Sequence, residues 1–287
     1  MASSPFADLP RIKIPRSGGL NHLERILGLL QDSGPLCSSD ALFVSIDLEV
    51  SRDERSKLLQ SSDRPLVKEY GVAILDTRDI GGCTDGIGLH QLISTRHYST
   101  RPLERPRRPN RVAIRECIFA HTNQVDPYEL PSIIAQSLCV RDAKAPSPRT
   151  CFRNIAIVGH SVKHDLRILQ RLGIDILGIA PLLVILDTHN MARDVLGPTS
   201  TRLGSRAPIS SFTLAAVLAE IGCSYDEAEL HNAGNDATYT LFALLGLAVR
   251  SSLARTLNDA ESAKLEDLIR TTAPANRHRL SPSLGTA

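Results

Sequence analysis

The stretch ALFVSIDLEV (residues 41–50) decides the fold, because it joins an apolar run to two acidic side chains. Its β-branched and aromatic residues predict a central strand of a sheet. Side chains alternate between the two faces of a strand, so Asp47 and Glu49 project from the same face. Neighbouring carboxylates on a largely buried strand repel each other, and a divalent cation between them would relieve that repulsion. The alternative is a pair of strand-end carboxylates that face solvent.

A third acid follows a second apolar strand, which the stretch RNIAIVGH (153–160) predicts. A helix is expected over about residues 163–172, so Asp165 lies just past the carboxyl end of the strand, where α/β sheets place their ligands. The ordinary interpretation of Asp165 alone is a solvated acid that stabilises the first turn of the helix. His160 in the same stretch is either a ligand or a residue that packs the loop.

A histidine and a fourth acid lie in LHNAGNDA (230–237), before an apolar helix expected over residues 233–252. Five residues is not a same-face spacing within an α-helix. We therefore expect His231 on the loop before the helix and Asp236 in its first turns, with both side chains facing one cleft. A hydrogen-bonded structural histidine is the ordinary interpretation of His231 alone. The joint pattern of four acids and one histidine, each at a strand end or a helix start, is far more specific than any of its parts.

The remaining elements extend the same architecture. Further strands are expected at 67–77, 90–100 and 181–188, and further helices at 21–32, 127–140 (capped by Asp126), 190–196 and from Ser210 or Ser211 to near Gly222. Short connections favour antiparallel neighbours among the first three strands, and the later alternation of strands and helices favours parallel pairing. The sequence thus predicts an α/β fold with a mixed five-stranded sheet and helices on both faces. We expect a tail with a short helix at 1–38, the main domain at 39–255 and a polar tail at 256–287, which holds a short helix at 259–269.

Bulk composition narrows the class of protein. The net charge is +2, from 33 basic and 31 acidic residues, which neither requires nor excludes a nucleic-acid partner. Aromatic residues make up only 4% and Trp is absent, which argues against a broad stacking platform for bases. The six cysteines form no C-x-x-C pair, and the sequence has no apolar signal core, so we expect an intracellular protein of the cytoplasm or nucleus. No run of roughly 20 apolar residues occurs, so we expect no membrane span.

These motifs resemble those of the DEDDh exonucleases, which have a ribonuclease H-like fold. Asp47 and Glu49 match the first motif, Asp165 the second, and His231 and Asp236 the third. Asp187-Thr188 in VILDTHNMAR matches a secondary, mainly structural feature. The similarity covers about residues 40–253. The sequences of the motifs most resemble those of a fungal branch related to an mRNA-export-associated factor and to exonucleases of RNA silencing.

The resemblance implies an activity and a site. Two Mg²⁺ or Mn²⁺ ions about 3.5–4 Å apart would contact the attacking and leaving oxygens of a phosphodiester. Asp47, Glu49 and Asp236 would share one ion, Asp47 would bridge to the second, and Asp165 would act partly through water. His231 would take a proton from the attacking water. The products would be nucleoside 5′-monophosphates, released from the 3′ end of RNA or single-stranded DNA.

Contacts to the nucleic acid are less defined by the motifs. His160 opens the second motif, and Val50 and Ser51 follow the first-motif acid where small or Thr residues are usual, so these residues bear on substrate fit. Val50 is expected either to wedge against the terminal base or only to pack. Seven arginines lie between residues 96 and 115, and among them Arg105, Arg107 and Arg108 are candidates for phosphate contacts. The alternative is a solvated insertion.

Two other functions are compatible with the same residues. One is a catalytically weak RNA-binding adaptor of the same fold, with a protein partner in RNA processing, export or silencing. The other is a ribonuclease H-type endonuclease, which would cut internally and ignore a blocked 3′ end. The complete set of five site residues favours an enzyme.

Overall fold

The computed structural model describes residues 14–30, 40–50, 66–81, 88–100, 116–145, 151–179, 181–197, 211–255, 263 and 265–268. The candidate contact residues Ser51, Arg105, Arg107 and Arg108 lie outside the described residues, as does Ser210. Every helix in the described part is too short or too polar to span a bilayer.

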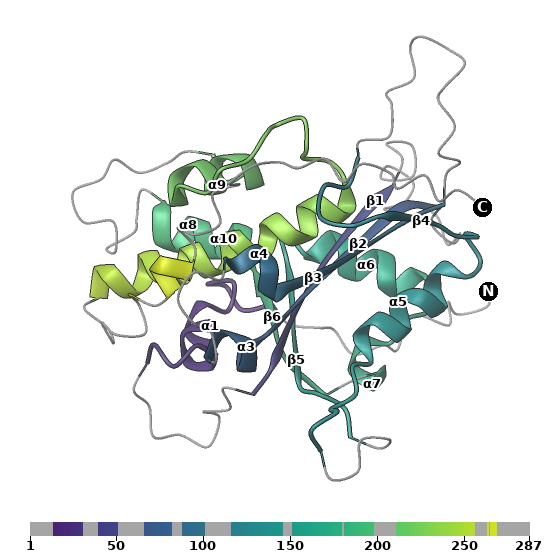
Figure 1. The fold of residues 1–287 in the computed structure, drawn as a ribbon, viewed down its shortest axis with the longest axis horizontal. Helices are drawn as coiled ribbons and strands as arrows, with labels where there is room; N and C mark the ends of the chain where they lie inside the picture. The colour runs from purple at the N-terminus through teal and green to yellow at the C-terminus, as the bar shows by residue number, and fades with distance from the viewer. Residues whose placement is uncertain are drawn as a thin grey trace, which may run out of the picture.

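A mixed sheet forms the centre of the fold, in the strand order β4-β3-β2-β1-β5-β6 (Figure 1). The strands are β1 (Leu42–Val50), β2 (Val67–Asp76), β3 (Ile93–Ser99), β4 (Thr122–Gln124), β5 (Ile155–Gly159) and β6 (Leu182–Asp187). Strand β2 pairs antiparallel with both β1 and β3, whereas β5 pairs parallel with β1 and β6. The predicted α/β fold and its five strands are confirmed. The predicted number is wrong by one, because the short β4 adds a parallel edge strand beside β3.

Helices cover both faces of this sheet. They are α1 (Leu20–Ile26), α3 (Thr77–Gly81), α4 (Leu89–Leu92), α5 (Leu130–Leu138), α6 (Lys163–Arg171), α7 (Ile176–Ile179), α8 (Thr188–Leu196), α9 (Leu214–Ile221) and α10 (Ala233–Arg255). Helix α10 packs on one face with α1, α8 and α9, while α5 and α6 lie on the other (Figure 1). Alternation along β1 serves both cores, since Phe43 faces α10 whereas Val44 and Ile46 face α5 and α6. Asp47 and Glu49 continue the Phe43 face.

The segment around α1 belongs to the core. Leu20 and Leu23 are fully buried in the cluster beneath α10. The Ser251 hydroxyl of α10 donates to the buried Glu24 at 2.6 Å, and the Asp187 amide donates to the Gly18 carbonyl at 2.9 Å. Residues 18–29 thus pack beside β6 and α10. The domain boundaries at residues 38 and 255 stay predictions.

Two predicted helix caps are wrong. Helix α5 begins at Leu130, and the Asp126 carboxylate instead accepts the Tyr128 amide at 2.8 Å in the preceding turn. Helix α9 is capped by Thr213, whose hydroxyl accepts the Ala216 amide at 3.3 Å, and not by Ser211. A threonine nearer to the apolar run supplies the same oxygen in better register with the first turn.

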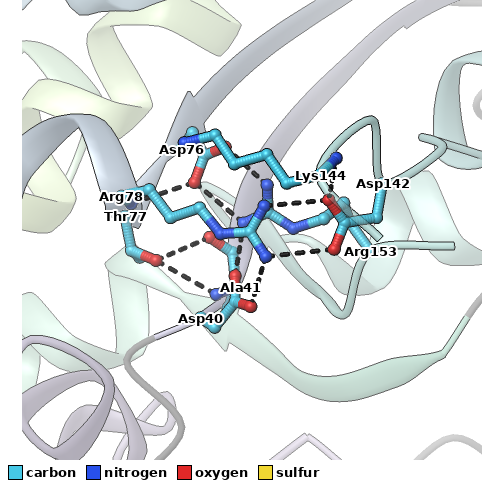
Figure 2. A network of polar contacts seen from close by, with 8 residues as sticks. All are labelled: Asp40, Ala41, Asp76, Thr77, Arg78, Asp142, Lys144 and Arg153. Carbon is cyan, nitrogen blue, oxygen red and sulfur yellow. Dashed lines mark hydrogen bonds and ion pairs between the residues drawn. The ribbon is translucent and has the colours of Figure 1, made fainter. Parts of the chain in front are cut away.

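Five charged residues form a cluster at the end of the sheet where β1 begins (Figure 2). Arg153, only 6% exposed, donates to both oxygens of Asp76 at 2.6 and 2.8 Å and to Asp40 at 2.7 Å. Arg78 donates to both oxygens of Asp142 at 2.9 and 3.0 Å and also contacts Asp40. This charge cluster joins the starts of β1 and β5 to the end of β2, because its arginines bond acids from different segments. Each charge is paired and hydrogen-bonded, which offsets part of the cost of burying it.

The arginines alter the protonation of the carboxyl groups. Hydrogen bonds from Arg78 lower the pKa of Asp142 to about 2. Burial raises the pKa of Asp76, but hydrogen bonds from Arg153 and from the Arg78 amide outweigh it, so this pKa lies below the ordinary 3.8. Both groups therefore bind protons more weakly in the folded chain than in the unfolded chain.

We expect acid to remove the stability that this cluster contributes. Groups with a lowered folded pKa stabilise the fold above their unfolded pKa, and that stability is lost as the pH falls from about 4 to about 2. Urea denaturation followed by circular dichroism should show this fall, and Asp142→Asn should make it shallower. Asp175→Asn, which changes a carboxylate outside the cluster, is the control. An Asp142→Asn curve parallel to the wild-type curve would contradict the expectation.

Candidate active site

Three of the five predicted site residues form one tight group. Glu49, His231 and Asp236 each offer one ligand atom, and these atoms lie within 4.8 Å of one another. Glu49 comes from the end of β1, His231 from the turn before α10, and Asp236 from the first turn of that helix. Residues separated by almost two hundred positions therefore meet at the end of the sheet opposite the charge cluster.

Asp47 lies one step behind Glu49 on the same face of β1. Its Cα pairs with Gly71 on β2, and the Cα of Glu49 pairs with Glu69. Asp47 is half-buried, and its Oδ2 atom accepts no hydrogen bond among the described residues, although the residue makes other contacts. The structure thus keeps Asp47 beside the three-residue group but outside the set that shares the 4.8 Å limit.

Asp165 approaches the same strand from the helix that follows the neighbouring strand β5. It lies in the first turn of α6, is 5% exposed, and accepts the Leu48 amide at 3.1 Å. Leu48 stands between Asp47 and Glu49, so Asp165 sits beside both acids of the first motif. The register of β1 with β5 ends at Ser45, which explains why the Leu48 amide takes a side-chain acceptor here.

A glycine on β2 lets α10 approach the strand that carries the acids. A Cβ atom at Gly71 would lie 1.8 Å from the Ala233 carbonyl oxygen. Any side chain at this position would push the first turn of α10 away from β1, because Gly71 is the direct partner of Asp47. Close backbone contact, rather than a long side chain, therefore sets the position of Asp236.

The turn before α10 is closed by local hydrogen bonds. The Asn232 side chain accepts the amides of Gly234 and Asn235, each at 3.1 Å, and so caps the helix. The His231 amide donates to Asp236 at 2.9 Å. His231 and Ser161 are the described non-glycine residues with positive φ, at 63° and 62°. Such a conformation costs about 1 kcal/mol, and it exposes the His231 ring at the group of acids.

Two other predicted contact residues face the interior. Both ring nitrogens of His160 bond within the protein, to the Thr188 hydroxyl at 2.9 Å and to the Phe212 carbonyl at 2.8 Å. Burial, and then the neighbouring His189, lower the pKa of His160 to about 4, so its ring is neutral at pH 7. Val50 is only 6% exposed and packs in the core beneath α5 and α6, which favours the packing interpretation.

The secondary feature at Asp187 is built as a helix cap. Its carboxylate accepts the amides of His189 and Asn190 at the start of α8, and also the amide of Ser161. Asp187 thereby fixes the turn that follows β5 and leads into α6, which carries Asp165.

The group of donor atoms suits a hard divalent cation. Carboxylate oxygens are the preferred ligands of both Mg²⁺ and Mn²⁺, and Glu49 and Asp236 supply them. The Oδ1 atom of Asp236 is buried and accepts no hydrogen bond in the described part, whereas its Oδ2 holds the His231 amide. Asp236 therefore holds the turn at His231 and also belongs to the group of possible cation ligands.

Sequence reasoning missed four residues that shape this site: Gly71, Glu69, His97 and Asn232. Only Asn232 carries a local signal, because an Asn directly before an apolar helix is a common cap. The roles of the other three depend on strand register and on a close contact between distant segments.

The chain was compared with known proteins. The DEDDh_C family model, described as the DNA polymerase III subunit epsilon-like, C-terminal domain, matches residues 42–247. Among solved structures, that of the yeast NOT1 MIF4G domain co-crystallized with CAF1 is similar, with a TM-score of 0.37 and 10% sequence identity over 84% of this chain and 85% of that chain. The comparison with curated proteins gave no match.

We expect Gly71→Ala to disturb the site more than the fold as a whole. The added methyl group must displace the first turn of α10, at a cost of about 1–3 kcal/mol for overpacking. Binding of Mn²⁺, followed by isothermal titration, should weaken at least tenfold. Gly173→Ala is the comparison, because it strains a left-handed glycine with φ of 78° that has open space around it, far from β2 in the sequence. Equal Mn²⁺ affinities of the two variants would contradict the expectation.

Proposed function

This chain belongs to the DEDDh family of DNA polymerase III epsilon-like domains, and on that basis we propose that it is a metal-dependent 3′-to-5′ exonuclease. The observation that supports the proposal most strongly is the meeting of Glu49, His231 and Asp236 within 4.8 Å. Two of these residues are acids that can hold a cation, and the third can carry a proton. Hydrolysis of a phosphodiester needs both functions.

Divalent Mg²⁺ or Mn²⁺ ions would supply charge neutralisation at the phosphate and a lowered pKa for the attacking water. In the proposal Glu49, Asp236 and Asp47 would hold the cations, and Asp165 would complete the set from the first turn of α6. The hydrogen bond from the Leu48 amide ties Asp165 to the strand that carries Asp47 and Glu49. Fixed ligands favour the transition state because they need no reorganisation during the reaction.

His231 is the proposed general base. Its ring is exposed while its backbone amide is tied to Asp236, so the imidazole is free to meet a water molecule at the acids. In the base role His231 would accept the proton of the attacking water, while bound cations would supply charge neutralisation at the phosphate.

The substrate in this proposal is RNA or single-stranded DNA with a free 3′ end. The likeness of the motifs to a fungal branch linked to mRNA export and RNA silencing makes RNA the first substrate to test. An intracellular location and a protein partner in RNA processing belong to the same proposal. A choice between RNA and DNA would be made at the 2′-hydroxyl group.

Loss of a metal ligand should abolish cleavage. Purified protein is incubated with Mn²⁺ and 5′-labelled RNA or DNA oligonucleotides that carry a free or a blocked 3′ end. The wild type should shorten only the unblocked strands from the 3′ end. Asp47→Ala and Asp236→Ala should lose this activity but keep the far-ultraviolet circular dichroism spectrum, whereas Asp175→Asn should cleave normally. Cleavage of the blocked strand would indicate an endonuclease, and binding without cleavage would indicate an adaptor; either result overturns the proposal.

His231→Ala should act on the chemical step. We expect kcat to fall by roughly 10²–10⁴ and the pH–rate profile to change shape, because water then loses its proton without the imidazole. Mn²⁺ affinity should change much less than in Asp236→Ala. A pH–rate profile with the wild-type shape would exclude His231 as the base.

A further inference from the structure

A buried acid and a buried histidine lie directly under the turn that carries His231. Glu69 of β2 is 8% exposed, and His97 of β3 is fully buried. In the strand register Glu69 stands opposite Glu49, and His97 stands opposite Gly71. Both side chains therefore point to the face of the sheet on which α10 begins.

The two side chains form one hydrogen-bonded unit. The Nε2 atom of His97 lies 3.2 Å from Oε2 of Glu69, and its Nδ1 atom lies 2.9 Å from the Thr122 hydroxyl. A donor is needed at the carboxylate, so Nε2 carries the proton toward Glu69 and Nδ1 accepts from Thr122. The short β4 strand, which pairs Thr122 with His97, provides this last contact.

The unit also supports the first turn of α10. The Ala233 amide donates to Oε2 of Glu69 at 3.5 Å. The next amides have other acceptors, since those of Gly234 and Asn235 take the Asn232 side chain. Glu69 thus completes the set of acceptors that the start of a helix requires, and its negative charge is favourable there.

The fit between the unit and the helix is tight. A Cβ atom at Gly234 would lie 2.9 Å from Cβ of His97 and 2.7 Å from Sγ of Cys117. The His97 side chain therefore packs directly against the first turn of α10. His231 lies two residues before Ala233, and Asp236 lies three residues after it. A shift of this turn would move both functional side chains.

We propose that Glu69 and His97 are positioning residues, which hold the left-handed turn at His231 and the first turn of α10 so that His231 and Asp236 meet Glu49. The inference rests on the proposed function for its effect on catalysis. The placement of the turn itself can be measured without any activity. Residues that orient ligands from behind in this way change metal affinity or rate by about 10–100-fold when they are replaced.

The test compares Glu69→Ala, Glu69→Gln and His97→Ala with the wild type. Thr95→Val is the matched control, because the Thr95 hydroxyl contacts Thr238 at 2.8 Å and so links the same strand to the same helix farther from the site. Three quantities are measured: amide hydrogen exchange of residues 229–240 by mass spectrometry, the Kd for Mn²⁺ by isothermal titration, and kcat and KM on an unblocked oligonucleotide. Thr122→Val, which removes only the outer hydrogen bond of His97, gives a milder change should an alanine variant fail to fold.

The expected result distinguishes a shift of the turn at His231 from a general loss of fold stability. Exchange at residues 231–236 should quicken and the Kd for Mn²⁺ should rise by about 10–100-fold in Glu69→Ala and His97→Ala. A fall in kcat with little change in KM should accompany these effects. Glu69→Gln should recover part of the loss, because its amide oxygen can still accept the Ala233 amide, and Thr95→Val should match the wild type in all three quantities.

Two outcomes would overturn the inference: wild-type exchange and Mn²⁺ affinity in Glu69→Ala and His97→Ala, or equal changes in Thr95→Val. A wild-type protein that binds no Mn²⁺ and releases no nucleotide would instead refute the proposed function. In that case the exchange of residues 231–236 still decides whether Glu69 and His97 hold the turn.

Discussion

The contact between the first turn of α10 and the middle of β2 is the constraint on which the rest of the site depends. Ala233 lies against Gly71, so closely that even one methyl group would not fit between them. Since Gly71 pairs with Asp47, this contact places the start of the helix directly over the first-motif acids. Backbone atoms are stiffer than side chains, and the separation of Asp236 from Glu49 is therefore set by the least deformable part of the structure.

Acidic residues are paired with arginines at one end of the sheet and lie close to other acids at the opposite end. At the start of β1 each of Asp40, Asp76 and Asp142 has an arginine within hydrogen-bond distance, so the charge cluster links neighbouring strands. At the other end Glu49 and Asp236 approach within 4.8 Å. Two unit charges at this separation repel by about 3 kcal/mol when the effective dielectric constant is about 20. The helix start and the His231 amide offset part of this repulsion, and a bound cation would turn the remainder into affinity.

Much of the fold could be predicted because its signals are local. The apolar run before Asp47 marks β1 whatever surrounds it, and period-two alternation puts Asp47 and Glu49 on one face. The five-residue spacing from His231 to Asp236 likewise favours a turn followed by a helix, which the structure has. By contrast, the three residues of β4 have no hydrophobic pattern, and they pair only because β3 presents an open edge. Helix α1 is amphipathic in sequence, but its burial depends on packing against α10 and β6, which are distant in sequence.

The part of the site that sequence could not predict depends on register. Nothing near Glu69 indicates that it will stand opposite Glu49, nor that His97 will reach it diagonally from the next strand. The same limit applies to Asp165, because its acceptor role exists only where β5 stops pairing with β1 after Ser45. A strand longer than its neighbour must satisfy its remaining amides by other means. Here the acceptor is the Asp165 carboxylate of α6. The unpaired Leu48 amide of β1 therefore brings a third acid to the end of the strand where Asp47 and Glu49 already lie. The site therefore lies where the sheet is incomplete, because only there can acids from a strand and from two helices come together.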